Sequence, residues 1–270
     1  DHQIVKLTMP TDHRAYYDHV HQTVMKAIYD AIQQYDRKEA SYTKTRQNVL
    51  SHLNSLRAAT NYPWEAGTVQ DTVKVTEVLK IATQAKKDDR KLIIFTNRIA
   101  VGGKLEAVLQ AAGIKTLRIY DTDDHAKPRK LSQADRDLRI EQFQEDDTVT
   151  ALVGNLDLLS EGLTLVEASI IVHYDHDWKS ISWSQGNNRV VRPGQTFDPV
   201  PVYDLLIADT VDCYVHSAML KKARATLQTI DRQFDTQEST TIDPIDVART
   251  LLNNEEMTHA HAGICQEQPG

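Results

Sequence analysis

Residues 91–120 read KLIIFTNRIAVGGKLEAVLQAAGIKTLRIY. The segment opens with a short, continuous apolar run, Lys91–Thr96, which is typical of a strand covered on both faces. A helix is predicted from Ala100 to about Ala112, and Gly113 is placed to end it as the residue after the C-cap. Thr116–Tyr120 is predicted to be the next strand. A strand, a helix and a second strand in so short a stretch predict one unit of a parallel sheet.

The same alternation continues toward the C-terminus. Ser132 and Asp135 have the spacing of an acidic capping box and predict the start of another helix. Further strands are predicted at residues 149–153, 169–174 and 200–207, and a last helix runs from about residue 210 into the 230s. Strands and helices that alternate in this way predict an α/β fold, a parallel sheet with helices on both faces.

The N-terminal part has a different pattern. A short strand-like run, Ile4–Leu7, is followed by two predicted helices, and Pro63 ends the second one. The apolar residues of the first helix recur every three or four positions: Ala15, Tyr16, Val20, Val24, Ile28, Ile32 and Tyr35. We expect a helical extension at 1–66, the α/β domain at 67–233, and a C-terminal extension at 234–270 that holds a short helix near 246–252 and is partly disordered.

The composition limits the classes of protein to consider. With 40% hydrophobic and 26% charged residues, the chain can bury a core. No stretch approaches the length and apolarity of a membrane span, and the two cysteines, Cys213 and Cys265, fit neither a metal motif nor a disulfide framework. The net charge of −7 argues mildly against nucleic acid. A protein that binds nucleic acid, however, needs only a narrow strip of donors that face phosphate.

The most informative stretch for function is residues 175–195, DHDWKSISWSQGNNRVVRPGQ. Gln185, Arg189 and Arg192 stand at i, i+4 and i+7, which places them on one face of a helix. Two guanidinium groups on one face favour an anionic partner, and a triphosphate suits them. The alternative for such a spacing is a solvated basic helix face.

This stretch resembles motif six of the Swi/Snf-type ATPases, Q-x-x-x-R-x-x-R-x-G-Q. The residues that meet it are Gln185, Arg189, Arg192, Gly194 and Gln195. The upstream D-x-D-W of the family is met at residues 175–178, Lys91–Thr96 resembles motif four, and Ser160–Leu165 resembles motif five. The resemblance covers about residues 1–225 and implies the second RecA-like lobe of a superfamily-two helicase-like ATPase. Lys179, Thr164 and Val191 depart from the family pattern, and we expect a divergent bacterial or phage member.

The resemblance also implies roles for particular residues. Arg189 and Arg192 would be the catalytic residues that contact the triphosphate. The other implied contacts are Gln185, Glu161 and Gly162 for ATP, and Thr96, Asn97, Ser160 and Thr164 for DNA. ATP and Mg²⁺ would be held mainly by a first RecA-like lobe of the same polypeptide. The implied partner is double-stranded DNA, in the cytoplasm or, in a eukaryote, the nucleus, with no membrane partner.

The sequence lacks the motifs that would hold a nucleotide phosphate or a metal ion by themselves. The chain has no G-x-x-x-x-G-K-[ST] motif and no acidic box for magnesium, so we expect that it cannot hydrolyse ATP by itself. The histidine pairs at 19 and 21 and at 173 and 176 have no cysteine or carboxylate at a metal-binding spacing, and we expect no metal site. The leading function is ATP-driven translocation on, or remodelling of, duplex DNA. The alternatives are a non-catalytic interaction module with the same fold, which a Walker motif upstream would exclude, and an unrelated doubly wound enzyme.

Overall fold

A parallel sheet forms the centre of the protein in the computed structural model, which describes residues 2–67, 69–122, 128–129, 131–155, 167–176, 178, 200–230 and 242–264. Six described strands pair in the order β1-β8-β7-β2-β6-β3, and every pairing is parallel. Their bounds are β1 His2–Leu7, β2 Lys91–Phe95, β3 Thr116–Arg118, β6 Ala151–Gly154, β7 Ala168–His173 and β8 Val202–Ile207. Two very short strands, β4 Asp121–Thr122 and β5 Pro128–Arg129, form a separate antiparallel pair.

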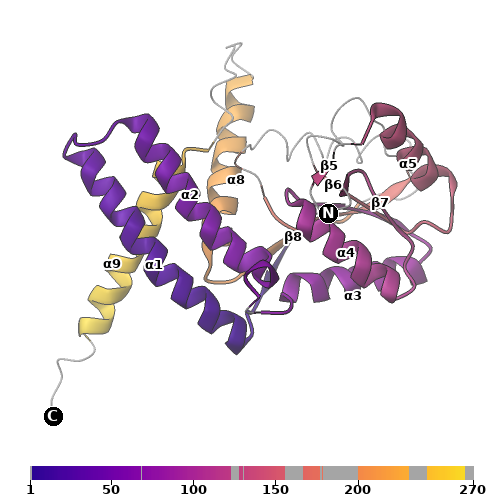
Figure 1. Cartoon of the computed structure of the whole chain (residues 1–270), viewed down its shortest axis with the longest axis horizontal. Coiled ribbons are helices and arrows are strands. Elements are labelled where there is room, and N and C mark those ends of the chain that lie inside the picture. The colour runs from indigo at the N-terminus through magenta and orange to yellow at the C-terminus, as the bar shows by residue number, and fades with distance from the viewer. Residues whose placement is uncertain are drawn as a thin grey trace.

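Helices cover both faces of the sheet, as predicted (Figure 1). Leu92 and Ile94 of β2 face a core shared with α3 (Val73–Lys87) and α4 (Ile99–Ala111). Ile93 and Phe95 point to the opposite face, where α5 (Gln133–Glu145) packs. All four side chains are fully buried or nearly so, which explains why the strand has no polar alternation. The capping prediction is confirmed, since the backbone N–H of Asp135 donates to the Ser132 hydroxyl over 3.1 Å.

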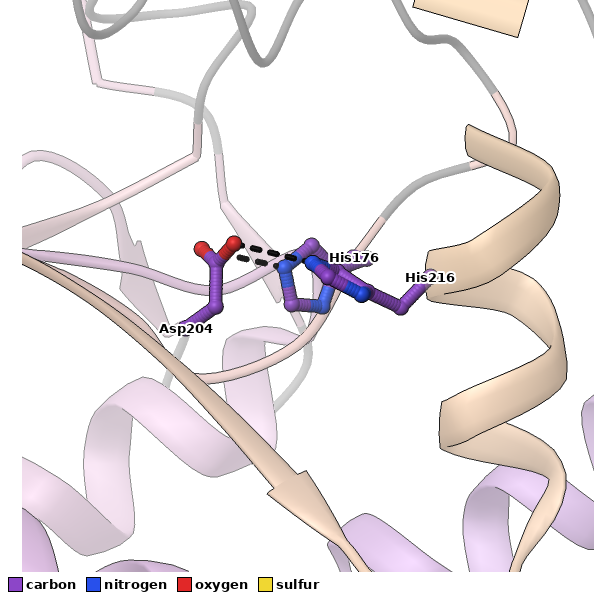
Figure 2. A group of neighbouring side chains, drawn as sticks. All are labelled: His176, Asp204 and His216. Carbon is purple, nitrogen blue, oxygen red and sulfur yellow. Dashed lines mark hydrogen bonds and ion pairs between the residues drawn. The ribbon is translucent and has the colours of Figure 1, made fainter. Parts of the chain in front are cut away.

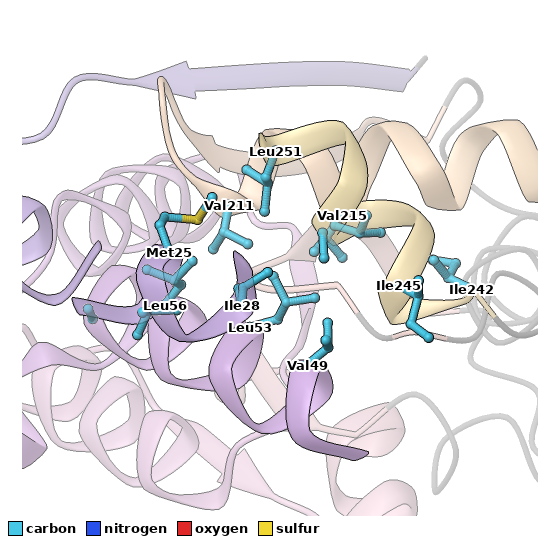
Figure 3. Packing of buried hydrophobic residues seen from close by; sticks show 14 of the residues in the cluster. Met25, Ile28, Val49, Leu53, Leu56, Val211, Val215, Ile242, Ile245 and Leu251 are labelled. Atoms are coloured by element: carbon cyan, nitrogen blue, oxygen red, sulfur yellow. The ribbon is translucent and has the colours of Figure 1, made fainter. Parts of the chain in front are cut away.

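The remaining long helices gather beside the sheet. They are α1 (Thr11–Asp36), α2 (Tyr42–Asn61), α8 (Val211–Ile230) and α9 (Pro244–Ile264). Figure 3 shows their shared core, in which Ile28, Leu53 and Val215 come from three different helices. A 3-10 turn, Pro63–Ala66, leads from α2 toward α3.

Two connections cross the predicted domain boundaries. β1 pairs with β8 along six residues, so the first strand belongs to the sheet of the α/β domain. α9 is longer than the predicted short helix and begins at Pro244. Its residues Ile245, Ala248 and Leu251 are buried against the N-terminal helices, a long-range contact that leaves no local sequence signal. None of the helices in the described ranges is long and apolar enough to cross a membrane.

Candidate functional site

Three neighbouring strands end at the same edge of the sheet and place polar residues there. β6, β2 and β7 lie side by side and are parallel, so their carboxyl ends meet. Asn155 follows β6, Thr96 and Asn97 follow β2, and Asp175 comes two residues after β7. Ligands of open parallel sheets bind at this edge, which makes these residues the described part of a candidate site.

Asp175 organises the edge. Its side chain is buried at 3% exposure, and its carboxylate accepts three hydrogen bonds. The Thr96 hydroxyl donates to Oδ2 over 3.0 Å, and the backbone N–H and side-chain amide of Asn97 donate to Oδ1 over 2.9 and 3.1 Å. Asn155 extends the chain of contacts, because its amide donates to Oδ1 of Asn97 over 3.4 Å. Donors from the end of β2 therefore converge on one carboxylate that follows β7, and Asn155 from the end of β6 joins them through Asn97.

These contacts bear on the residues predicted to touch DNA. The Thr96 side chain is 2% exposed and its hydroxyl is occupied by Asp175, whereas Asn97 is half-buried. Their role as DNA contacts stays a prediction. Sequence reasoning missed Arg98, which is exposed at the start of α4 and whose guanidinium carbon lies 4.9 Å from the centre of the Tyr62 ring. An isolated arginine before a helix has no pattern that would single it out.

A cluster of buried charged and polar residues contacts Tyr174, the residue before Asp175. Lys74, at the start of α3, is fully buried, and its ammonium group lies 2.5 Å from Asp212 Oδ2, 2.6 Å from Asn61 Oδ1 and 2.8 Å from the Tyr174 carbonyl. Burial alone raises the pKa of Asp212, but Lys74 and Asn61 lower it below its ordinary value. Burial raises the pKa of the Tyr174 hydroxyl, which donates to the Asn61 carbonyl over 2.7 Å. The cluster joins the ends of α2 and β7 to the starts of α3 and α8.

The other predicted site residues lie outside the described residues: Ser160, Glu161, Gly162, Thr164, Gln185, Arg189 and Arg192. Their attachment points are described. The segment 156–166 follows Asn155, and the segment 179–199 follows Trp178, so both leave the sheet from the edge that Asp175 organises.

Trp178 is the tryptophan of the D-x-D-W stretch at residues 175–178. Its described contacts are with α2 and the approach to α9. The indole N–H donates to Asn54 over 3.5 Å, Arg57 lies over the ring at 5.6 Å, and the Trp178 carbonyl accepts from the backbone of Ile242 over 2.8 Å. The residue thus fastens the edge to the helical bundle.

Comparison with known proteins agrees with this architecture. Residues 73–194 match the family model described as the helicase conserved C-terminal domain. This part of the chain is similar to helicase C-terminal domains. The fold is that of the RecA-like C-terminal lobes of Swi2/Snf2 ATPases, which confirms the resemblance seen in the sequence. The prediction of a bacterial or phage origin stays a prediction.

Solved structures share the fold of this chain. The C-terminal part of the Fun30 ATPase domain superposes with a TM-score of 0.67 at 14% identity, covering 94% of this chain and 98% of that one. The Sulfolobus solfataricus SWI2/SNF2 ATPase C-terminal domain gives 0.62 at 18% identity, covering 88% and 91%. The core of the Sulfolobus ATPase in complex with dsDNA gives 0.62 at 20% identity, covering 85% of this chain and 45% of that one.

Curated relatives are similar over most of the chain. The mouse DNA excision repair protein ERCC-6-like is 23% identical over 190 residues, which are 70% of this chain and 15% of the relative. Helicase swr1 of Schizosaccharomyces pombe is 27% identical over 186 residues, 69% of this chain and 13% of the relative. The chain therefore spans less than a fifth of the length of these relatives.

Proposed function

We propose that this chain is the second motor lobe of a DNA-dependent ATPase that moves along or remodels duplex DNA. The observation that carries the proposal is the common edge of β6, β2 and β7. Thr96 and Asn97 lie at that edge, and the segments predicted to contact nucleotide and DNA, 156–166 and 179–199, both start from it. The relatives named as helicases, and the solved ATPase core in complex with dsDNA, support the assignment.

The described residues suggest how nucleotide and DNA contacts communicate. Asp175 precedes, by a few residues, the segment 179–199 that holds Arg189 and Arg192, and it accepts the hydrogen bonds of Thr96 and Asn97. A displacement of the arginine segment would therefore reach the β2 edge through one buried carboxylate. Lys74, which is paired with Asp212, donates to the Tyr174 carbonyl and so fixes the chain just after β7.

The residues of this chain supply only part of an ATP site. The described edge offers neutral donors, one exposed arginine and one buried carboxylate, which do not cradle a triphosphate by themselves, so we infer that a first lobe holds most of ATP and Mg²⁺. ATP hydrolysis would supply the free energy for movement. Arg189 and Arg192 would stabilise negative charge that develops in the transition state when the two lobes close, with Gln185 positioning them.

Arg192→Ala in the full-length protein tests the proposal. Arginine residues in this role contribute on the order of a thousandfold or more to the turnover rate. We expect DNA-stimulated turnover to fall by about that factor while nucleotide affinity changes much less. The matched control is Arg37→Ala, an exposed arginine after α1, which should leave turnover unchanged. Equal turnover in the two variants would remove Arg192 from the active site.

Duplex binding tests the DNA half of the proposal separately. Asn97→Ala and Arg98→Ala change the exposed part of the edge without removing the buried Thr96 hydroxyl. We expect both to weaken sequence-independent binding, and Arg98→Ala to lower the slope of log affinity against log salt by about 0.9 if it neutralises one phosphate. A slope identical to that of the Arg37→Ala control would show that this edge does not face DNA.

A further inference from the structure

Three imidazole groups surround one buried carboxylate on β8, next to the end of β7. Asp204 of β8 has a fully buried side chain. Nε2 of His216 lies 2.9 Å from its Oδ2, and Nε2 of His176 lies 3.2 Å from its Oδ1. Figure 2 shows both rings directed at the carboxylate, one from α8 and one from the chain beyond β7. His2 of β1 adds a third nitrogen 2.7 Å from Oδ2.

The donor set has the composition of a transition-metal site. His176, Asp204 and His216 are all buried, and one ligand atom from each lies within 4.8 Å of the others. Imidazole nitrogen and carboxylate oxygen are ligands that zinc prefers, at about 2.0–2.2 Å. Tetrahedral bonds of that length set neighbouring ligand atoms about 3.3 Å apart, which is close to the 3.2 and 2.9 Å distances from His176 and His216 to Asp204.

A hydrogen-bonded network accounts for only part of this arrangement. Within the described residues, Nε2 of His176 makes no hydrogen bond, although its side chain is only 4% exposed and the atom lies 3.2 Å from Asp204. A buried polar atom without a hydrogen bond costs about 1–3 kcal/mol. A cation between the nitrogen and the carboxylate would give that nitrogen a ligand bond in place of the missing hydrogen bond.

We propose that His176, Asp204 and His216 bind a zinc ion. His2, whose side chain is 36% exposed, supplies a fourth ligand at the rim. The four residues come from β1, the end of β7, β8 and α8, so the ion would fasten the edge strand and α8 to the sheet. His176 also lies directly before the segment of Arg189 and Arg192, and the ion would fix the point from which that segment departs. The proposal does not depend on the ATPase assignment.

Metal content and cobalt spectroscopy test the site on the protein itself. After addition of zinc and then dialysis against metal-free buffer, we expect one zinc per chain by elemental analysis. Replacement by Co²⁺ should give the intense visible absorption of a four-coordinate ion, and chelation should lower the melting temperature. Less than one zinc per chain that survives dialysis, or the weak spectrum of six-coordinate Co²⁺, would overturn the proposal without any variant.

His216→Gln separates metal binding from hydrogen bonding. The glutamine amide can still donate to Asp204, so a hydrogen-bonded network would persist, whereas the metal would lose a ligand. Outer-shell changes alone cost 10–100-fold in metal affinity, so we expect zinc affinity to fall by at least about 100-fold. His19→Gln, on the exposed face of α1, is the matched control and should retain full affinity. Unchanged zinc affinity in His216→Gln, or an equal loss in both variants, would contradict the site.

Discussion

Lys74→Met should destabilise the fold severely, because it removes one half of a buried ion pair. The ammonium group is fully buried and contacts Asp212, Asn61 and the Tyr174 carbonyl within 2.8 Å. Removing one partner of such a pair leaves an uncompensated charge and costs about 3–5 kcal/mol. One kcal/mol shifts the melting temperature of a chain near this size by about 2–4 °C. We therefore expect a loss of roughly 10 °C.

Urea unfolding followed by circular dichroism measures the effect, and Lys80→Met is the control on the same helix. Lys80 is 75% exposed and contacts only Glu77, at 3.1 Å, within the described residues, so its replacement should change the free energy of unfolding by about 0.5 kcal/mol or less. The double variant Lys74→Met/Asp212→Leu should recover much of the loss, since no buried charge remains unpaired. A Lys74→Met protein as stable as Lys80→Met would refute the reasoning.

The pH dependence of the same pair has a defined sign. The folded-state pKa of Asp212 is lowered, so its contribution is present above its unfolded value near pH 4 and is lost as the pH falls through the folded value. Without Lys74, burial raises this pKa instead, and the variant loses stability as the pH rises above about 4. The gap in unfolding free energy between wild type and Lys74→Met should therefore be larger at pH 7 than at pH 4. A gap that stays constant across this range would show that Asp212 keeps its charge by other means.

Three further substitutions test the packing and the site edge. A Cβ at Gly102 would lie 1.6 Å from the Tyr120 hydroxyl oxygen, so Gly102→Ala should lower the free energy of unfolding by about 1–3 kcal/mol. A thermal melt measures the change, and an unchanged melting temperature would show that the Tyr120 ring moves away. Gly103 lies on the same helix with its nearest neighbour 3.7 Å away, so Gly103→Ala should stabilise by about 0.5–1 kcal/mol, and a loss would reveal crowding there. Asp175→Asn replaces one acceptor oxygen by an amide donor that faces other donors, so it should cost about 1–3 kcal/mol of unfolding free energy. It should also lower DNA-stimulated turnover. Normal turnover would argue against coupling through Asp175.

Local patterns predicted much of the sheet and its helices. The continuous apolar run at Lys91–Phe95 became a fully covered central strand, and Ser132 caps α5 as its spacing indicated. The bundle core was not predicted, because contacts between α1 and α9 join segments about 200 residues apart. Neither segment carries a signal of its partner.

In the candidate sites, too, some placements could be predicted from the sequence and others could not. The placement of Thr96 and Asn97 at the carboxyl edge follows from strand direction and was predictable. The partnership of His176 with Asp204 and His216 was not, since the three ligands come from separate elements and only the folded chain brings them together. The burial of Lys74 could not be predicted either, because a lysine at a helix start ordinarily points to solvent.

The most direct test of the motor-lobe assignment is ATP hydrolysis by this chain alone and by the full-length protein, each measured with and without duplex DNA. The account predicts no turnover above background for the isolated chain under either condition. It predicts turnover by the full-length protein that duplex DNA stimulates and that Arg192→Ala abolishes. DNA-stimulated hydrolysis by the isolated chain, lost in its own Arg192→Ala variant, would contradict the claim that the active site needs a first lobe.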